Sequence, residues 1–482
     1  MYLTQGLHRA LQRHPAKLAL RHVGAEAQRE YTFERFVSDI ARVQLFACWW
    51  LGAVACPLNV RWSLAELRHA LADCGARQLL ADAAHARAAS ELQDVVTVVP
   101  AEALAAQAQD LAPLDDTRTG GDALATILYT GGTTGRAKGV MLSHANFWCA
   151  AMTRGAELNN SSDSITLLVA PLFHVAGLGR LIGQSIVGGG CITMPQFRPA
   201  AVIETIACHG VTDIIVVPSM LQALLDEPSF DPARVKSVDR IAFGAAPMPP
   251  DLLDRALAAW PHAEFFQAYG LTETAGAVCI NLPANHTVQG RESGRLASVG
   301  RAGLGAEIRV VDDQGRDVPR GTVGEIIVRG PMVCGGYGCQ PDTTAQALRD
   351  GWLRTGDGGR MDGDGYLFIA DRLKDMIISG GENVYSAEVE AALRGHPAVA
   401  DAAVIGIPDE RWGEAVHAVV VLRDSHADRE AVLRAELVAA CRRLLAGYKC
   451  PRSIEFSAAL PLSAAGKVLK TQLRAQVRKA AA

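Results

Sequence analysis

The sequence lacks an apolar run long enough to cross a membrane. Its longest run, Leu45 to Leu58, falls short of the roughly 20 residues that a membrane helix needs, and it contains Gly52 and Pro57. The first residues, Met1 to Gln5, have no basic segment followed by an apolar core, so no secretory signal is evident. We therefore expect a cytoplasmic protein without a transmembrane segment.

Cysteine and histidine are present, but without the spacings of structural sites. The eleven cysteines include no Cys-x-x-Cys pair, and the thirteen histidines include no His-Glu-x-x-His. Cys48 and Cys56 lie inside apolar runs, as is typical of small buried side chains in a reducing compartment. A disulfide framework and a structural zinc site are therefore not expected.

A block of positive charge is also lacking. The formal net charge is -4, and lysine and arginine do not gather into a segment that could follow a nucleic-acid backbone. Nucleic acid is thus not an expected partner. With 49% apolar and 20% charged residues, the composition is instead that of a globular protein.

The 482 residues are too many for one ordinary hydrophobic core, so more than one domain is expected. Short apolar runs alternate with amphipathic stretches from Leu124 to Gly270, which predicts βαβ units and a largely parallel sheet. The runs are Ala125 to Tyr129, Ile165 to Ala170, Ile214 to Pro218 and Arg240 to Phe243. Hairpin patterns between Arg309 and Arg329 predict a β-rich subdomain near residues 300–370.

A charged pentad, Asp371 to Asp375, separates these segments from a new cycle of helix and strand patterns. The sequence therefore predicts an α/β protein with two domains. Residues 1–371 form a large N-terminal domain of mixed and parallel sheets with helices, and residues 372–482 form a small α+β C-terminal domain.

A glycine-rich loop follows the strand Ala125 to Tyr129. Glycines allow backbone N–H groups to converge, threonine hydroxyls add donors and a lysine adds a cation, which together suit a polyphosphate. The alternative is a polar turn that only reverses the chain. The candidate nucleotide-phosphate residues are Thr130, Gly131, Gly132, Thr133, Thr134, Gly135 and Lys138.

The order of residues in this loop resembles the signature of the adenylate-forming superfamily, which includes acyl-CoA synthetases, firefly luciferase and the adenylation domains of peptide synthetases. Gly131 stands where serine is usual in that signature, and Ala137 where proline is usual. The first change removes one hydroxyl donor, while the backbone donors and Lys138 remain.

Further motifs occur in the order of that superfamily. By resemblance, Tyr269 packs near the adenine, Thr272 contacts the α-phosphate region and Glu273 helps to hold Mg²⁺, a hard cation that prefers oxygen ligands. The strand-to-helix turn after Phe243 resembles the turn beside the adenine and the acyl pocket. The remaining nucleotide-binding candidates of these motifs are Gly244, Ala245, Ala246, Gln267, Ala268 and Gly270.

The C-terminal motifs complete the resemblance. Asp357, in Thr355-Gly356-Asp357, is the expected ribose ligand, and Arg372 is a second ribose or phosphate contact. Lys467 is the expected catalytic lysine, which neutralises charge on the carboxylate and the α-phosphate. In the superfamily the C-terminal domain rotates about a hinge to admit a thiol. The hinge and coenzyme A candidates are Lys374, Gly380, Gly381 and Glu382.

The resemblance implies an AMP-forming carboxylate:CoA ligase that uses ATP, Mg²⁺ and coenzyme A. Relatives that activate amino acids place an aspartate after the phenylalanine of one core motif, where this chain has His174 after Phe173. We therefore expect a medium- or long-chain fatty acid, with an aryl acid such as a benzoate or cinnamate as the alternative. His174 either lines the acyl pocket or is a core residue, and the glycines from Gly177 to Gly190 are expected to leave room for a long or flat acid.

The resemblance breaks near the N-terminus. The chain passes from Val43 to Leu45 where a strand-helix unit is expected, and such a loss would expose a sheet edge. Three function hypotheses therefore remain open: a CoA ligase, an adenylation enzyme that loads a carrier protein, and an inactive paralogue that binds without catalysis. Reduced stability and altered oligomerisation are further possible consequences of the missing unit. A homodimer stays open as one assembly state.

Overall fold

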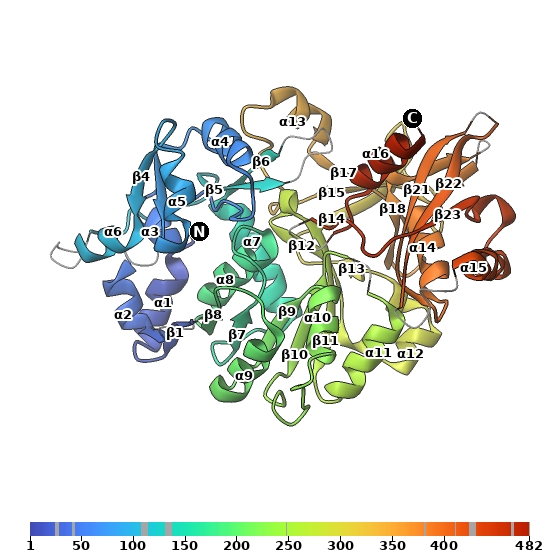
Figure 1. Ribbon diagram of the computed structural model, residues 1–482. Helices are drawn as coiled ribbons and strands as arrows, with labels where there is room; N and C mark the ends of the chain where they lie inside the picture. The colour runs from blue at the N-terminus through green and yellow to red at the C-terminus, as the bar shows by residue number, and fades with distance from the viewer. Residues whose placement is uncertain are drawn as a thin grey trace. The chain divides into compact units, whose positions relative to one another are not determined.

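The computed structural model describes residues 1–24, 28–40, 44–107, 114–130, 137–246, 248–379, 382–409, 411–423, 430–463 and 467–481. The chain divides by its internal packing into two compact units (Figure 1). The first comprises residues 1–308 and 328–354, and the second comprises residues 309–327 and 355–482. The predicted domain boundary after Asp371 falls inside the second unit.

Within the described residues, the first unit is built on a nine-stranded sheet with the order β13-β12-β11-β10-β9-β7-β8-β1-β2. Its central strands are parallel, and the outer pairs β1–β2, β11–β12 and β12–β13 are antiparallel. The strands are β1 (Leu18–Val23), β2 (Gln28–Thr32), β7 (Ile165–Leu168), β8 (Gly190–Thr193), β9 (Asp213–Val216), β10 (Arg240–Gly244), β11 (Glu264–Leu271), β12 (Gly276–Asn281) and β13 (Arg301–Ala302). The predicted α/β class is confirmed.

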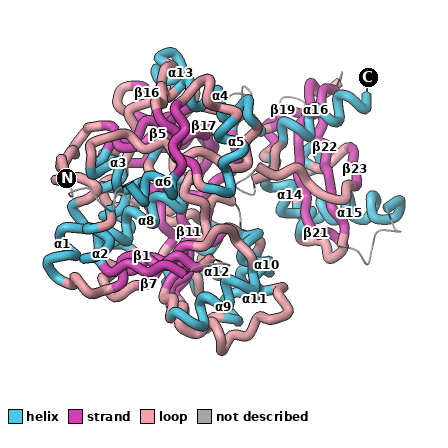
Figure 2. The backbone as a smooth tube through the Cα atoms, turned by 60° about the vertical axis from the view of Figure 1, so that its left-hand side comes forward, coloured by secondary structure: helices cyan, strands magenta, loops and turns pink. Residues whose placement is uncertain are grey.

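Helices cover this sheet and bury its apolar face. One large core cluster joins α9 (Pro199–His209), α10 (Pro218–Leu225) and α11 (Pro250–Ala259) to β9 and β10, and these three helices group together in Figure 2. Each of them has proline in its first turn, where the missing N–H costs no helical hydrogen bond. In the same unit, α7 (His144–Glu157) packs against α8 (Val175–Val187), and α8 also contacts β7 and β8.

The run Ala125 to Tyr129 does not join the parallel sheet, and this part of the prediction is wrong. It forms β5 (Leu124–Thr130), which pairs antiparallel with β6 (Lys138–Ser143) in a separate two-stranded sheet. The five residues Ala125 to Tyr129 are all buried. A continuous apolar run indicates burial on both faces but not the direction of the neighbouring strand.

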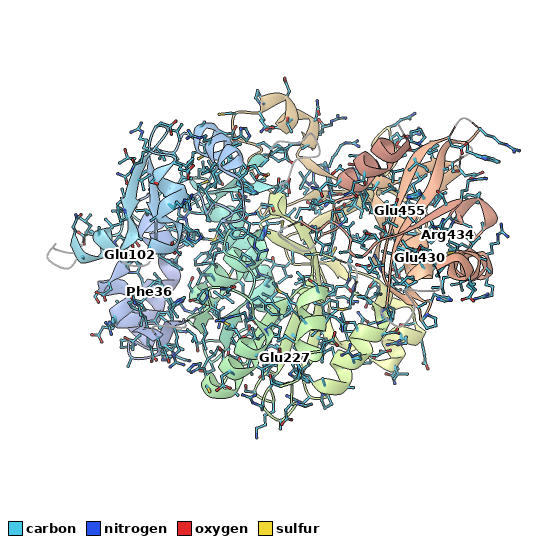
Figure 3. All side chains as sticks on the ribbon, in the orientation of Figure 1. Phe36, Glu102, Glu227, Glu430, Arg434 and Glu455 are labelled. Carbon is cyan, nitrogen blue, oxygen red and sulfur yellow. The ribbon has the colours of Figure 1, made fainter. Side chains whose placement is uncertain are left out.

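Short helices and strands make up the N-terminal part of the first unit, where the resemblance to the superfamily breaks between Val43 and Leu45. Phe36 of α2 (Phe33–Ser38) and Phe46 of α3 (Gln44–Trp50) pack edge to face with ring centroids 5.2 Å apart; Phe36 is labelled in Figure 3. The strands β3 (Gln78–Ala81) and β4 (Thr97–Pro100) form a parallel pair. The helices are α1 (Gln5–Arg13), α2 (Phe33–Ser38), α3 (Gln44–Trp50), α4 (Leu64–Asp73), α5 (Ala86–Ser90) and α6 (Ala101–Gln107). Farther along the chain lie α12 (Val288–Glu292), α13 (Pro341–Ala347) and the short strand β16 (Leu348–Arg349).

The second unit contains strands of two sheets. One sheet contains β14 (Glu307–Val311), β15 (Gly324–Arg329), β17 (Trp352–Met361) and β18 (Leu367–Arg372), together with β16, and these strands lie between residues 307 and 372. The other contains β19 (Ile377–Ser379), β20 (Glu382–Val384), β21 (Val399–Asp409), β22 (Gly413–Leu422) and β23 (Ser453–Phe456). A core cluster joins it to α14 (Ser386–Arg394) and α15 (Glu430–Leu444), and α16 (Lys470–Ala481) packs on β21.

None of the helices in the described ranges is both long and apolar enough to span a bilayer.

A buried ion pair connects the central strands of the first unit. Asp213 on β9 is paired with Arg180 on α8, and Thr166 on β7 bonds to both; the exposed fractions are 2% for Asp213 and 8% for Arg180. Replacing one partner leaves the other as an uncompensated buried charge.

We expect Asp213→Ala to lower the free energy of unfolding of the first unit by about 3–5 kcal/mol. The measurement is the denaturant midpoint of its unfolding transition. The matched control is Asp239→Ala, because Asp239 pairs with Arg240 at 3.2 Å but its side chain is 54% exposed. An equal, small effect of both substitutions would contradict the structural role of the buried pair.

Candidate functional site

The glycine-rich segment connects the two strands of a hairpin. Thr130 at the end of β5 pairs with Lys138 at the start of β6, and Tyr129 pairs with Gly139. The predicted phosphate-binding residues Gly131, Gly132, Thr133, Thr134 and Gly135 lie outside the described residues. The described part is the stem of the hairpin, formed by β5 and β6. The register of these two strands brings Thr130 and Lys138, at the two ends of the segment, together.

A second backbone ladder runs along the other side of β6. Met141 N donates to Gly336 O at 2.9 Å, Gly335 N donates to Met141 O at 3.0 Å, and Gly338 N donates to Gly139 O at 2.8 Å. The segment 335–338 therefore lies beside the stem although it is some 200 residues away in the chain. This ladder fixes the position of Tyr337, which bridges to Val140.

Tyr337 connects two of the predicted site residues. Its hydroxyl donates a hydrogen bond to Glu273 Oε1 at 2.9 Å, and the ammonium of Lys138 lies 5.2 Å from the centroid of its ring. Lys138 and Glu273, predicted from two separate motifs, are thus brought to the same aromatic side chain. The sequence reasoning missed Tyr337; its only signal is an aromatic residue between glycines in the segment Gly335 to Gly338.

A tight turn presents Thr272 and Glu273. The 3₁₀ turn Thr272–Thr274 follows β11 directly, and the hydroxyl of Thr274 accepts from Leu271 N at 3.0 Å and donates to Gly276 O at 2.6 Å. A Cβ atom at Gly270 would fall 1.9 Å from Gly276 O, so only glycine permits this approach of β11 to β12. Thr272 and Glu273 are both half-buried.

The predicted adenine-side residues lie together at the carboxyl ends of β10 and β11. Gly244 pairs with Ala268, and Phe243 pairs with Gln267. A Cβ atom at Gly244 would lie 2.3 Å from Ala268 O. Ala245 has φ of 66°, a left-handed conformation that costs a non-glycine residue energy and occurs preferentially at functional sites. Ala246, Ala268 and Tyr269 are half-buried, and their assignment to the adenine stays a prediction.

The expected room beside α8 is not there. A Cβ atom at Gly177 would lie 2.4 Å from Pro171 O, and at Gly189 it would lie 2.1 Å from the amide nitrogen of Gln184. At Gly179 it would lie 3.1 Å from the guanidinium of Arg154. These glycines therefore permit close packing of protein on protein. The inference of acyl-chain space from them is wrong, because small residues indicate close approach without indicating what approaches.

Arg154 occupies much of the space at Gly179. Its Nη2 donates to Gly179 O at 2.6 Å, and a Cβ atom at Gly276 would fall 2.8 Å from Nη1. Burial, together with the positive charge of Arg180, lowers the pKa of Arg154 to about 10. His174 is half-buried at the N-terminus of α8, with its ring centroid 4.7 Å from that of Phe173. Its two sequence interpretations, an acyl-pocket residue and a core residue, stay open.

In the second unit, the structure brings Asp357 and Arg372 together. They are paired across β17 and β18, and Arg372 Nε lies 2.7 Å from Asp357 Oδ1. The backbone of the turn is fixed because Asp357 N donates to Thr355 Oγ1 at 3.1 Å and Gly356 N donates to Glu325 Oε1 at 3.2 Å. A nearly buried carboxylate beside a guanidinium suits hydroxyl recognition, and the assignment to ribose stays a prediction.

Lys467 is exposed in the second unit. Its backbone closes a turn with Ser463, since Ser463 N donates to Lys467 O at 2.7 Å and Lys467 N donates to Ser463 Oγ at 3.1 Å. Lys374 lies in the 3₁₀ turn Leu373–Asp375, and Glu382 is exposed on β20. Gly380 and Gly381 lie outside the described residues.

Sequence reasoning also missed a buried polar network near these residues. Asp371 accepts from the backbone N and the hydroxyl of Ser386, both at 2.5 Å. Lys470 bonds to Ser386 and pairs with Glu390 at 2.7 Å. A charged pentad and a tail lysine thus contribute to the fold of the second unit.

The residues present fit one magnesium ion held together with substrate phosphates. Among the described residues no group of three or more His, Cys, Asp or Glu side chains converges on a point. Mg²⁺ is commonly held by one or two carboxylates plus substrate phosphates, without an all-protein cage. Glu273, a half-buried carboxylate, is the ligand that the resemblance predicts, and this role stays a prediction.

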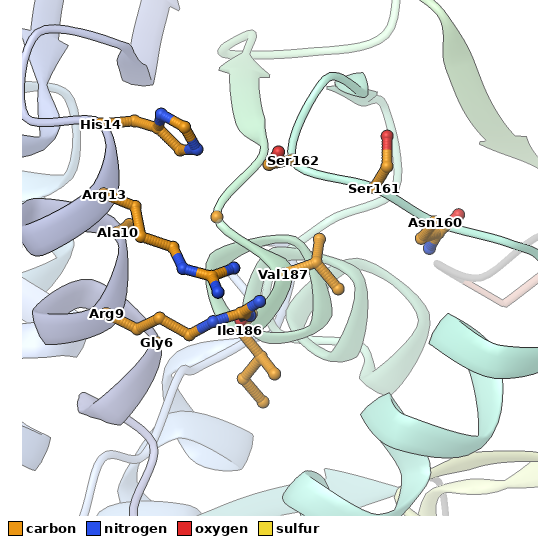
Figure 4. Close-up of a pocket in the computed structure, with 11 residues that line it drawn as sticks. Gly6, Arg9, Ala10, Arg13, His14, Asn160, Ser161, Ser162, Ile186 and Val187 are labelled. Carbon is orange, nitrogen blue, oxygen red and sulfur yellow. Dashed lines mark hydrogen bonds between the residues drawn. The ribbon is translucent and has the colours of Figure 1, made fainter.

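A distinct cleft lies at the far end of α8. It has a volume of about 270 Å³ and is lined by Arg9 and Arg13 of α1, by Ser161 and Ser162, and by Val187 (Figure 4). None of the predicted site residues among the described residues lines it. This cleft is therefore not the candidate site.

Comparison with known proteins places these features in a family. The family model described as AMP-binding enzyme matches residues 41–338, and the model described as AMP-binding enzyme C-terminal domain matches residues 388–467. A feruloyl-CoA synthase of Amycolatopsis is 43% identical over 437 residues, which are 89% of this chain and 85% of that protein. A long-chain-fatty-acid–CoA ligase of Mycobacterium tuberculosis is 37% identical over 434 residues, 88% and 84% of the two chains.

Solved structures are similar over nearly the whole length. The o-succinylbenzoate CoA synthetase of Bacillus subtilis, in complex with its acyl-adenylate intermediate, has a TM-score of 0.86 at 31% identity and covers 97% of both chains. The anthranilate CoA ligase AuaEII, in complex with anthranoyl-AMP, has a TM-score of 0.89 at 26% identity, covering 100% of this chain and 98% of that one.

We expect Tyr337→Phe to weaken the binding of ATP with Mg²⁺ by about tenfold. The substitution removes the hydrogen bond that the Tyr337 hydroxyl donates to the Glu273 carboxylate, and this bond orients the carboxylate. Tyr337→Ala should weaken it further, since the ring beside Lys138 is lost as well. Isothermal calorimetry measures both constants, with Tyr448→Phe, an exposed tyrosine of the second unit, as control. An unchanged dissociation constant in Tyr337→Phe would contradict a role of the Tyr337–Glu273 hydrogen bond in nucleotide binding.

Proposed function

The chain belongs to the AMP-binding enzyme family of adenylate-forming acyl-CoA synthetases, and we propose that the acid it activates is an aryl acid of the hydroxycinnamate type. It is an AMP-forming acid–CoA ligase, with ATP, Mg²⁺ and coenzyme A as its cosubstrates and metal. The observation that carries the choice of acid is the 43% identity to a feruloyl-CoA synthase over 89% of the chain.

A medium- or long-chain fatty acid is the second candidate. It is supported by the 37% identity to a long-chain-fatty-acid–CoA ligase, and it was the first expectation from the sequence. The surroundings of the glycines of α8 are occupied by backbone, Gln184 and Arg154. Those glycines were expected to leave room for a long or a flat acid, so their packing does not separate the two candidates, and the ranking rests on the sequence identities alone.

The first half-reaction forms an acyl-adenylate. A carboxylate oxygen of the acid bonds to the α-phosphorus, and the bond from that phosphorus to the bridging oxygen of pyrophosphate breaks. The step needs in-line positioning and compensation of phosphate charge. We assign the loop stem and Lys138 to the phosphates and Glu273 to Mg²⁺, which when bound neutralises charge on the phosphate oxygens.

The second half-reaction forms the thioester. The thiolate of coenzyme A bonds to the acyl carbon, and the carbon–oxygen bond to AMP breaks. Asp357 and Arg372 are assigned to the nucleotide during both steps, and residues 372–482 to a mobile domain. The strained turn at Ala245 and the ends of β10 and β11 are assigned to the adenine, because small residues there leave a flat surface for a ring.

A competition experiment tests the acid. The protein is incubated with ATP, Mg²⁺, coenzyme A and equal concentrations of a hydroxycinnamic acid and a long-chain fatty acid, and thioesters are quantified by mass spectrometry. We expect the aryl thioester to dominate. Dominance of the fatty acyl thioester would reverse the ranking. Acyl-AMP without thioester would point to a carrier protein as acceptor, and no product from folded protein would favour the inactive paralogue.

Lys467→Ala should lower the rate of acyl-AMP formation by about 10²–10³, the usual effect of removing one preorganised charge partner of a transition state. The dissociation constant of ATP should change little, since the contribution is to the transition state. Lys236→Ala, which removes another exposed lysine, is the control. Near-normal adenylation by Lys467→Ala would reject the assignment of this residue.

A further inference from the structure

The cleft at the end of α8 has a cationic wall. It is about 270 Å³ in volume and lies between α1, the segment 160–162 and the last residues of α8 (Figure 4). Arg9, Arg13 and His14 form its α1 side. None of the described residues that line it is an aspartate or a glutamate, so the positive charge of this wall has no counterpart inside the cleft.

Several polar side chains of the cleft have donors that no protein group uses. Arg9 Nη1 donates to Ile186 O at 3.3 Å, and its other N–H groups are left over. The guanidinium of Arg13 makes no hydrogen bond or ion pair with any described residue. The side chains of His14 and Asn160 likewise make no hydrogen bond within the described part of the chain. Donors gathered in a cleft without protein acceptors are suited to a ligand.

The two arginines also repel each other. Arg9 and Arg13 are four residues apart on α1, where like charges on one helix face are destabilising. Asp163, which follows the segment 160–162, pairs with Lys17 at 2.7 Å, so its charge is already compensated. An oxyanion bound between the guanidinium groups would remove this repulsion.

The donor set favours a phosphate over a carboxylate. A guanidinium presents a planar fork of N–H donors that matches two oxygens of either anion. Two arginines on successive turns offer two forks, and a phosphate monoester has three terminal oxygens where a carboxylate has two. Figure 4 shows both guanidinium groups directed toward the end of α8. Ser161 and Ser162, from the segment before β7, add hydroxyl donors to the lining.

We propose that this cleft binds a small, soluble phosphate monoester. The guanidinium groups of Arg9 and Arg13 hold the phosphate, and the hydroxyls of Ser161 and Ser162 are further donors to it. The described residues assigned to ATP do not line the cleft, so this site is additional to the proposed function and does not depend on it.

The test is calorimetric titration of the full-length protein with glycerol 3-phosphate in a buffer free of phosphate. We expect saturable binding, and Arg13→Gln should raise the dissociation constant about tenfold or more, because hydrogen bonds from a charged donor are lost. The matched control is Arg87→Gln, which removes an exposed arginine of α5 and should leave the constant unchanged. The dissociation constant of ATP with Mg²⁺ should be the same in Arg13→Gln and in the unaltered protein.

Two further titrations define the ligand class. Acetate should bind at least tenfold more weakly than glycerol 3-phosphate, because it fills only one guanidinium fork. Vesicles of phosphatidylcholine with phosphatidic acid present the same phosphate monoester on a lipid surface, and the protein should not sediment with them through Arg13.

Equal dissociation constants of glycerol 3-phosphate for Arg13→Gln and the unaltered protein would overturn the proposal. Binding of acetate as tight as that of glycerol 3-phosphate would also overturn it, as would sedimentation with the vesicles that depends on Arg13 without binding of the soluble phosphate. If the protein bound no ATP, the proposed function would fail, while binding of glycerol 3-phosphate that depends on Arg13 would still stand.

Discussion

The backbone ladder on both edges of β6 is the constraint on which the site depends. One edge pairs with β5 and closes the stem of the glycine-rich loop; the other pairs with residues 335–338. These hydrogen bonds bring Lys138, Tyr337 and Glu273 close together, although the three residues belong to segments that are far apart in the sequence. Main-chain pairing, which any sequence can make, thus sets the positions, and the side chains supply the chemistry.

Much of this arrangement was predictable, because the motifs follow strand ends. Gly244 and Ala268 lie side by side since parallel strands place their carboxyl ends at one edge of a sheet. Glu273 lies at the same edge, because it follows the carboxyl end of β11. The pairing partner of β5 was not predictable, because its continuous apolar run records burial on both faces and carries no information on strand direction.

The glycines show a second limit of prediction from the sequence. A glycine in a sequence signals close approach, but the approaching group can be a ligand, a backbone or a side chain. At Gly270 and Gly244 it is neighbouring backbone, and at Gly179 it is a guanidinium. Tyr337 was missed for the converse reason, because its role arises from a strand pairing between segments that no local pattern connects.

Arg154 occupies space beside α8 that the glycines of the sequence were expected to leave free. A guanidinium that lies beside α8 and close to Gly276, directly after the turn that presents Glu273, fills space and carries charge, and burial lowers its pKa only to about 10, so it stays protonated at neutral pH. An apolar group brought into contact with this guanidinium would desolvate the cation without offering it an acceptor. The carbonyl of Gly179 already supplies one acceptor at 2.6 Å, so the cation is stabilised by the protein itself. The glycines beside α8 therefore make room for a charged side chain of the chain's own, which no local pattern in the sequence indicates.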